Sequence, residues 1–493
     1  MKEKNKVIIT IIGVILFKLL YLLTRHVQED AFITWRVAKN IIDYGVYGFN
    51  GEERISSSTT HLYVLICVFF RLLFSDYFIY PLLIFNGILF TLGTKYLADL
   101  LLNNTTSKIL FIIFVCLLPP ALKISILGME FGMLFFLYVL FLYYALVKRQ
   151  KWAFIILPVL IIWTRLDAGL FLVITFLYDW IRQKKLNYPF ILGGILGGLT
   201  IMSFNYFYFG EIVNNTIVAK KIAYESNKTF GDHISEMISN TNFYSMLKIP
   251  RELCSVNVFF IITLLLSIFS LFKIKNKLNK TQSFILFIIY TYSCIRIAIF
   301  GIVNSWFDWY YWIPQIFMFV PVILLFIENV SVPKVSAYIL IFCIPLTLYQ
   351  TVHSIATGNG EWNYNRNVGI YIDRIEPDKN KTIYMESAGY ISYFSKLKVI
   401  DYVGLVDKRV TQEFIKDRKN VTENILKDLK PNYILEFNNP MFKGAVDSAT
   451  RSHYQLIKEF HISDVAKSDN YILNKIYRLK PSGTDYYLYK RID

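Results

Sequence analysis

The chain has 493 residues, of which 55% are hydrophobic, 17% aromatic and only 18% charged, and its mean hydropathy is +0.42. These values exclude an ordinary soluble globular protein and indicate a multi-pass membrane protein. We attribute the net charge of +16 to cytoplasmic loops and contacts with anionic lipids, so we expect membrane lipids and no nucleic acid among its partners.

Apolar runs predict a polytopic α-helical membrane bundle. The first run, from Val7 to Leu23, is long enough to cross a bilayer core of roughly 30 Å, and further runs between residues 62 and 348 bring the expected total to about 11–13 transmembrane helices. A Pro119-Pro120 pair predicts an interruption within the run from 109 to 126. The exact number of crossings between residues 76 and 148 stays open.

Basic clusters at 148–151, 182–185 and 273–280 predict cytoplasmic loops. They place the loop 25–60 and everything after Tyr349 on the opposite, extracytoplasmic face. Residues 351–493 have a mixed polar composition, with strand-like runs at 382–386, 397–401 and 432–436 and a helix-like stretch at 421–430. We therefore expect a transmembrane domain over 1–350 and an extracytoplasmic soluble α/β domain over 351–493.

Two adjacent carboxylates, Glu29 and Asp30, follow the first apolar run. A segment with helical periodicity, FITWRVAKNIIDYG at 32–45, comes directly after them. Such a pair can be a solvated helix flank, or it can hold a cation or accept the proton of a hydroxyl group. Its position at a membrane face favours catalysis.

The segment EDAFITWRVAKNIIDYGVYGFNGEER, at 29–54, resembles the first outer loop of the C-type superfamily of membrane glycosyltransferases. The similarity is closest to the branch that contains the mycobacterial cell-wall terminal arabinofuranosyltransferase. The chain departs from this branch by carrying Glu29 where Asp is usual and SSSTT at 56–60 in place of a Glu-Gly-Tyr-Thr step. Further matches occur in the family order: LGMEFG (127–132), TRLDAG (164–169), YFGEIVNNTIVAK (208–220), AGYISYF (388–394) and VIDYVGLVD (399–407).

This resemblance implies an enzyme that transfers a monosaccharide, a pentose or a hexose, from a polyprenyl-phosphate donor to a cell-envelope glycan or glycolipid on the extracytoplasmic face. It implies that Asp30 is the general base, with Glu29 assisting or placing a cation. The residues expected to bind the donor are Arg36, Arg165, Lys220, Lys221, Glu130 and Asp167.

The residues themselves leave alternatives for several of these assignments. Arg165 and Asp167 can simply pair with each other among apolar helices, and Lys220 and Lys221 can be ordinary interfacial lysines. We further expect Arg165 and Lys220 to share an outward-opening cavity with Asp30.

Two other classes of protein remain possible. One is a transporter or flippase of lipid-linked glycans, and the other is a scaffold whose C-terminal domain binds glycan. A carrier is expected to hold its charges near the middle of the bilayer and to show internal repeats, which the sequence lacks. The sequence predicts no certain cofactor and leaves the metal site unknown, with a divalent cation as an open option. The five scattered cysteines predict neither a metal site nor a disulfide.

Overall fold

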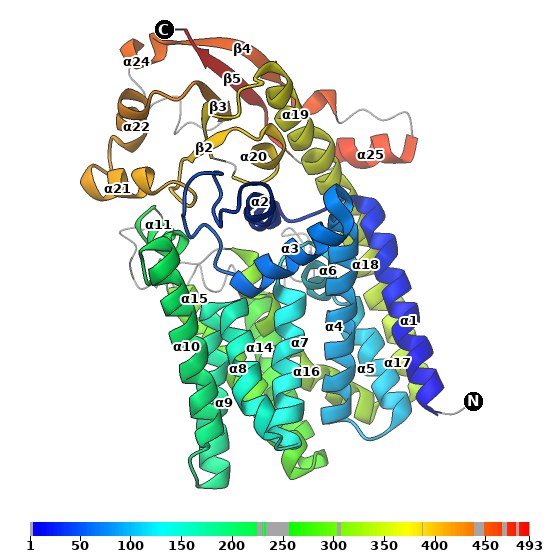
Figure 1. Cartoon of the computed structure of the whole chain (residues 1–493). Helices are drawn as coiled ribbons and strands as arrows, with labels where there is room; N and C mark the ends of the chain where they lie inside the picture. The colour runs from blue at the N-terminus through cyan, green and yellow to red at the C-terminus, as the bar shows by residue number, and fades with distance from the viewer. Residues whose placement is uncertain are drawn as a thin grey trace. The chain divides into compact units, whose positions relative to one another are not determined.

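Helices account for most of the chain in the computed structural model (Figure 1). The structure describes residues 3–223, 229, 231–232, 256–302, 307–386, 388–437, 448–465, 471–479 and 483–492. The chain divides into two units. The first contains residues 1–23, 80–201 and 227–351, and the second contains residues 24–79, 202–226 and 352–493.

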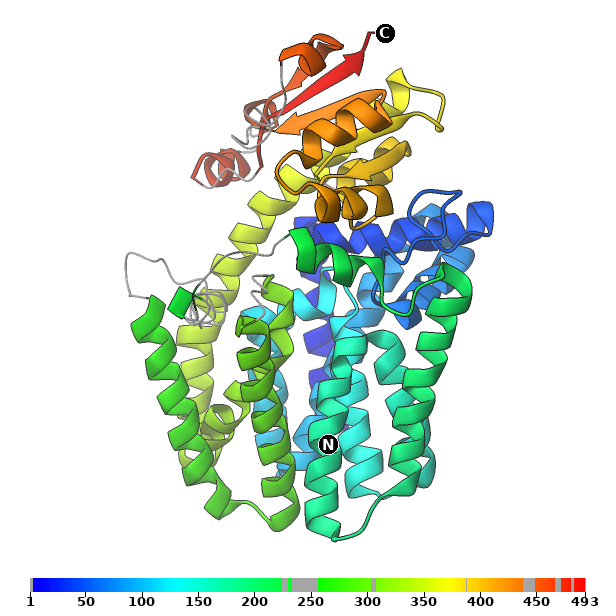
Figure 2. The same cartoon turned by 90° about the vertical axis from the view of Figure 1, so that its left-hand side faces the viewer.

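The first unit is helical in its described residues, and its long helices run side by side (Figures 1 and 2). Its helices are α1 (Glu3–Tyr21), α4 (Ile79–Leu101), α5 (Thr105–Leu117), α6 (Pro119–Ile126), α7 (Phe131–Leu140), α8 (Lys151–Thr164), α9 (Gly169–Gln183), most of α10 (Tyr188–Phe209), α14 (Val256–Ile274), α15 (Lys280–Ile302), α16 (Trp312–Asn329), α17 (Val332–Tyr338) and the first half of α18 (Ile344–Gly358). Two π-helical turns, η3 (Phe141–Val147) and η8 (Ile339–Cys343), extend α7 and α17.

Five helices in the described part of the chain are long and apolar enough to cross a membrane: Glu3–Thr24, Ile79–Leu101, Tyr188–Phe209, Lys280–Phe300 and Trp312–Asn329. Three shorter apolar helices accompany them: Thr105–Leu117, Phe131–Val147 and Lys151–Thr164. The predicted interruption is confirmed, because α5 ends at Leu117 and α6 begins at Pro119, where proline suits the first turn of a helix.

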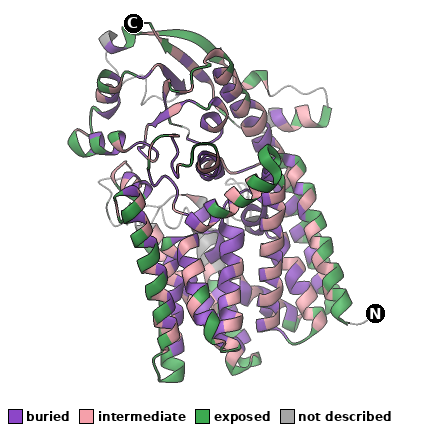
Figure 3. Cartoon of the chain, viewed as in Figure 1, coloured by how far each residue is buried: buried purple, intermediate pink, exposed green. Residues whose placement is uncertain are grey.

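Two of the long helices, α1 and α10, carry many exposed residues (Figure 3). On α1, Ile9, Ile12 and Leu16 are each more than half exposed, and on α10 the same holds for Ile195 and Leu199. Exposed apolar surface of this kind is unfavourable in water and suits contact with lipid chains. By contrast, α16 is largely buried among its neighbours.

The second unit is built around a five-stranded sheet with strand order β2-β1-β3-β5-β4. Its strands are β1 (Thr382–Met385), β2 (Lys398–Asp401), β3 (Tyr433–Phe437), β4 (Tyr454–Phe460) and β5 (Tyr486–Arg491). The strands β2, β1 and β3 are parallel, whereas β5 is antiparallel to both β3 and β4. The first three strands lie where the sequence predicts them, so the α/β architecture expected for the C-terminal residues is confirmed.

Helices pack on both faces of this sheet. The helices of the second unit are α2 (Glu29–Tyr44), α3 (His61–Phe74), α11 (Asn215–Ala223), α19 (Arg366–Ile375), α20 (Tyr390–Ser395), α21 (Lys408–Lys416), α22 (Val421–Leu429), α24 (Ser448–Ser452) and α25 (Tyr471–Leu479), with the π-helical turn η9 (Asn359–Asn365) ahead of α19. Strand side chains alternate between faces, so Ile383 and Met385 join one core cluster while Tyr384 joins the other.

The loop 25–60 shares a core with the C-terminal domain. Ile33 of α2 and Phe49 of the following loop belong to the same buried cluster as Val368, Val399 and Leu488. The division of the chain between Thr351 and Val352 is one residue from the predicted domain boundary. However, residues 24–79 and 202–226 group with the C-terminal residues rather than with the helical unit.

Candidate functional site

The carboxylates Glu29 and Asp30 form the first turn of α2. The sequence predicted a helix that starts after them, but the helix includes them, because acidic residues are favourable at the positive end of the helix dipole. Both side chains are partly buried. The next two turns bury Phe32, Trp35 and Ala38 completely, which anchors the acidic turn to the unit's core.

Glu29 lies against the C-terminal domain of its own unit. A Cβ atom placed on Gly389 would stand only 2.0 Å from Glu29 Cγ and 2.8 Å from the Glu29 carbonyl oxygen. Only glycine therefore fits this position without displacing the acid. The next residue, Tyr390, donates its hydroxyl to the Val27 carbonyl at 3.3 Å, and its ring centroid is 4.0 Å from that of Phe32.

A third carboxylate, Glu361, belongs to the same neighbourhood. It lies in the π-helical turn η9, and π-turns are frequent at functional sites. Its Oε2 atom is buried and has no hydrogen-bond partner among the described residues. Burial, followed by the nearby charge of Glu29, raises the pKa of Glu361 well above its usual range. The sequence did not single out this residue.

Asp30 has an environment suited to proton transfer. Burial raises the pKa of Asp30 above its usual value, while the positive charge of Lys220 acts in the opposite direction. Lys220 is partly buried on α11, whereas the adjacent Lys221 is exposed. The structure thus brings Asp30 and Lys220 close enough for their charges to interact.

The Arg36 side chain hydrogen-bonds to backbone carbonyls of its own unit. Its Nε donates to the Phe49 carbonyl at 3.0 Å, and its Nη1 and Nη2 donate to the carbonyls of Ser392 and Leu397, each at 2.5 Å. The guanidinium carbon also lies 4.3 Å from the centre of the Phe49 ring. These contacts give Arg36 a positioning role, because they tie α2 to α20 and to the start of β2.

Two neighbouring asparagines hold the segment that contains Lys220. Asn214 donates its amide to Ser56 Oγ at 2.5 Å and to the Ser58 carbonyl at 3.1 Å, and Asn215 donates to the Gly404 carbonyl at 2.8 Å. The stretch 56–60, where the sequence departs from the resembled branch, is therefore bonded directly to the NNTIVAK segment. Both asparagines are buried, and the sequence reading assigned them no function.

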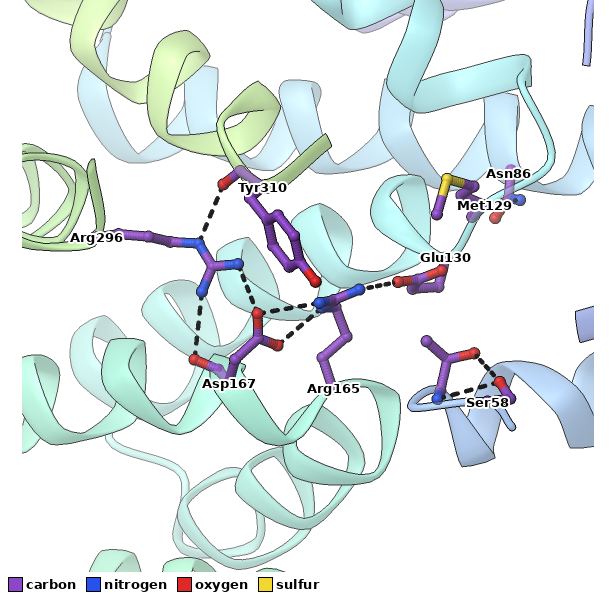
Figure 4. Close-up of polar contacts among 9 residues, drawn as sticks. Ser58, Asn86, Met129, Glu130, Arg165, Asp167, Arg296 and Tyr310 are labelled. Carbon is purple, nitrogen blue, oxygen red and sulfur yellow. Dashed lines mark hydrogen bonds and ion pairs between the residues drawn. The ribbon is translucent and has the colours of Figure 1, made fainter. Parts of the chain in front are cut away.

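The other predicted donor-binding residues lie in the first unit and form a network of ion pairs (Figure 4). Arg165 binds Glu130 Oε1 at 2.5 Å through Nη1, and it binds both carboxylate oxygens of Asp167 at 2.8 and 3.1 Å. Arg296, which the sequence reading missed, donates to Asp167 Oδ2 at 2.7 Å and to the Tyr310 carbonyl at 3.3 Å. The pairing of Arg165 with Asp167, left open as an alternative, is present.

The charges in this network compensate one another. Arg165, Glu130 and Arg296 are almost entirely buried. Burial alone would raise the pKa of Asp167, but the two arginines outweigh it and hold that pKa well below its usual range. Since Arg165 belongs to the first unit, and Asp30 and Lys220 to the second, the cavity that these three residues were expected to share stays a prediction.

Metal binding receives no support from the side chains that the structure describes. Among those residues, no group of three or more His, Cys, Asp or Glu side chains is arranged to hold a metal ion.

Residues 354–489 match a family model described as a domain of unknown function, DUF8728. The matched residues contain β1 to β4, most of β5 and the carboxylate Glu361, and they make up less than a third of the chain. A comparison with curated proteins gives no match.

Proposed function

We propose that this chain is an integral membrane glycosyltransferase that transfers a monosaccharide from a polyprenyl-phosphate donor to a glycan or glycolipid of the cell envelope, on the extracytoplasmic face. The observation that supports it most is the environment of Asp30, where burial raises the pKa of the carboxyl group and so makes it a stronger base than an exposed aspartate. The resemblance of the loop at 29–54 to the C-type superfamily supplies the class of reaction. Five apolar helices that could cross a membrane are consistent with a lipid-linked donor.

The proposed reaction needs one base and one cation near the reacting atoms. Asp30 takes the proton of the acceptor hydroxyl, whose oxygen then bonds to the anomeric carbon of the donor sugar. The bond between that carbon and the phosphate oxygen breaks, and the polyprenyl phosphate leaves with the electron pair. Lys220 is assigned the role of stabilising the negative charge of the departing phosphate.

The side chains of Glu29 and Glu361 support this assignment indirectly. Burial and the nearby charge of Glu29 raise the pKa of Glu361, which favours its protonated form. A protonated carboxyl group can donate a hydrogen bond to a sugar hydroxyl. We assign this role to Glu361, and we assign to Glu29 the alignment of the first turn of α2.

The test is turnover by the Asp30→Asn variant in isolated membranes supplied with a panel of polyprenyl-phosphate-linked pentoses and hexoses. Loss of a general base lowers rates by about 10²–10⁴-fold, and we expect a loss in this range with the protein still folded in detergent. The matched control is Asp43→Asn, an exposed carboxylate at the other end of the same helix, which should keep its turnover. Equal turnover by both variants would refute the assignment.

A carrier of lipid-linked glycans is the second candidate, favoured by the buried ion pairs of Arg165 and Arg296 among apolar helices. A carrier would move a fluorescent lipid-linked glycan across a proteoliposome without forming a covalent product. It would also keep this movement in the Asp30→Asn variant. Detection of such movement without any glycosyl transfer would replace the enzyme with the carrier.

A further inference from the structure

One arginine of the second unit has a guanidinium group without a polar partner. Arg366 is the first residue of α19 and is partly buried. Among the described residues, none accepts a hydrogen bond from its side chain or forms an ion pair with it, and its Nε atom is enclosed as well as unpartnered. The other two guanidinium nitrogens are not enclosed in this way, so they stay accessible to solvent or to a ligand.

Two aromatic rings hold this guanidinium group. Its central carbon lies 5.5 Å from the centre of the Trp362 ring and 5.3 Å from the centre of the Phe394 ring. The two ring centres are 6.2 Å apart, and the ring planes make an angle of 83°. Both aromatic side chains are only partly buried. Arg366 is therefore fixed against an aromatic wall, formed by Trp362 and Phe394, that is itself partly exposed.

The aromatic wall adjoins the acidic site. Trp362 directly follows Glu361 in η9, and the centre of its ring lies 6.2 Å from that of the Tyr390 ring. Burial raises the pKa of Tyr390, and the charges of Glu361 and Glu29 raise it further. The side chain of Tyr390 thus lies within electrostatic reach of both carboxylates and beside the wall that holds Arg366.

Packing alone does not explain an arginine at this position. A cation–π contact contributes little at a partly exposed site, whereas enclosing a guanidinium nitrogen without an acceptor removes the water that it would otherwise bind. By contrast, Arg374 of the same helix is exposed, so water can reach it. Because the guanidinium charge is delocalised over three nitrogens, an anion bound at the accessible nitrogens would offset the cost of enclosing Nε.

We propose that Arg366 binds the carboxylate or phosphate group of an acidic saccharide whose ring packs on Trp362. The planar fork of arginine matches the oxygens of both anions, and an aromatic wall with a few polar groups is typical of a small-molecule site. The saccharide rests on the proposed function, whereas the binding of an anion at Arg366 does not. In that function, the acidic saccharide is the acceptor, held beside the carboxylates of the site.

The test is isothermal titration of the full-length chain in neutral detergent with four probes: glucose, glucuronic acid, glucose 6-phosphate and inorganic phosphate. We expect at least one of the two charged sugars to bind about tenfold more tightly than glucose. Arg366→Gln should weaken the binding of that sugar by about tenfold or more, because hydrogen bonds to charged groups are stronger than neutral ones. Arg366→Lys keeps the charge and loses the fork, so its loss should be smaller than that of Arg366→Gln.

The matched control is Arg374→Gln, which removes the same charge from an exposed arginine of the same helix and should leave binding unchanged. Tighter binding of glucuronic acid identifies a carboxylate, and tighter binding of glucose 6-phosphate identifies a phosphate; either result supports the proposal, as does equal binding of the two.

The proposal fails if glucose binds as tightly as both charged sugars, if neither charged sugar binds up to roughly 10 mM, or if Arg374→Gln weakens binding as much as Arg366→Gln does. It also fails if inorganic phosphate binds as tightly as the charged sugars, because the saccharide then contributes nothing. Glycosyl transfer plays no part in this measurement. A failure here therefore leaves the turnover test of Asp30 unaffected, and an absence of transfer leaves this test unaffected.

Discussion

Asp167 of the first unit and Asp30 of the second have pKa values shifted in opposite directions. In the first unit, Arg165 and Arg296 surround Asp167 with positive charge, and the pKa of that carboxyl group falls well below its usual range. In the second unit, Asp30 and Glu361 are raised in pKa by burial. Arg36, on the same helix as Asp30, is directed to backbone carbonyls instead.

This difference separates a structural charge cluster from a site able to exchange protons. A carboxylate held between two arginines stays ionised at every physiological pH and gains stability from its partners, so it is a poor base. A carboxylate whose pKa is raised by burial is a stronger base and accepts a proton more readily than one held between arginines. The comparison therefore favours the second unit as the place of chemistry.

The largest expected effect comes from breaking the network of the first unit. Arg165→Ala leaves Glu130 and Asp167 buried with less compensation, and we expect a loss of about 3–5 kcal/mol in the free energy of unfolding. The measurement is the melting temperature of the purified chain in detergent. Arg182→Ala, an exposed arginine at the end of α9, is the control and should change the melting temperature little.

The next largest effect on stability is expected in the second unit, at Arg36. Arg36→Ala removes three hydrogen bonds to backbone carbonyls, and we expect a loss of about 2–4 kcal/mol in the free energy of unfolding. Arg374→Ala, an exposed arginine on α19 of the same unit, serves as the comparison. A melting temperature unchanged in Arg36→Ala would mean that Arg36 is free to bind a ligand, as the resemblance originally implied.

Local sequence patterns were enough to predict part of this arrangement. Apolar length predicted the long helices, the proline pair predicted the break between α5 and α6, and β-rich runs predicted β1, β2 and β3. The strands β4 and β5 were missed, because much of β4 is solvent-exposed and lacks the apolar alternation that marks a half-buried strand. The helix α2 was predicted from its periodicity, but not its inclusion of Glu29 and Asp30.

The composition of the acidic site could not be predicted, because it depends on contacts between distant segments. Glu361 lies more than 300 residues after Glu29, and nothing in the sequence EWNYN marks it as a carboxylate of the same neighbourhood. The grouping of residues 24–79 with the C-terminal domain likewise rests on a shared core. Arg296 was missed because it lies within an apolar helix, and only the fold shows its pairing with Asp167.

A moderate effect is expected where Gly389 meets Glu29. Gly389→Ala places a methyl group against Glu29 Cγ and its carbonyl, so the first turn of α2 must shift. We expect turnover to fall by about tenfold or more, because a displacement of this size misaligns reacting groups. Gly194→Ala, at an open position on α10, is the control.

Energetic coupling between Gly389 and Glu29 distinguishes an effect of Gly389 on the position of Glu29 from a general loss of protein stability. In a double-mutant cycle on melting temperature, Glu29→Ala should reduce the cost of Gly389→Ala, because it removes the side-chain part of the clash. If the changes in melting temperature of the two single variants simply add in the double variant, Gly389 does not act through Glu29.

The smallest effect concerns Lys220 and the pH profile of turnover. The proposed base, Asp30, can accept a proton only when it is deprotonated, so activity is expected to fall as the pH decreases through its raised pKa. The charge of Lys220 lowers that pKa, and its removal in Lys220→Gln should therefore move the acidic limb of the profile to higher pH. Lys221→Gln removes an equal charge from the exposed neighbouring residue and should leave the limb in place. If instead both variants lower turnover equally at every pH, then Lys220 contributes to donor affinity or local structure and does not tune Asp30, and the contrast between a compensated and a tunable carboxylate would rest on burial alone.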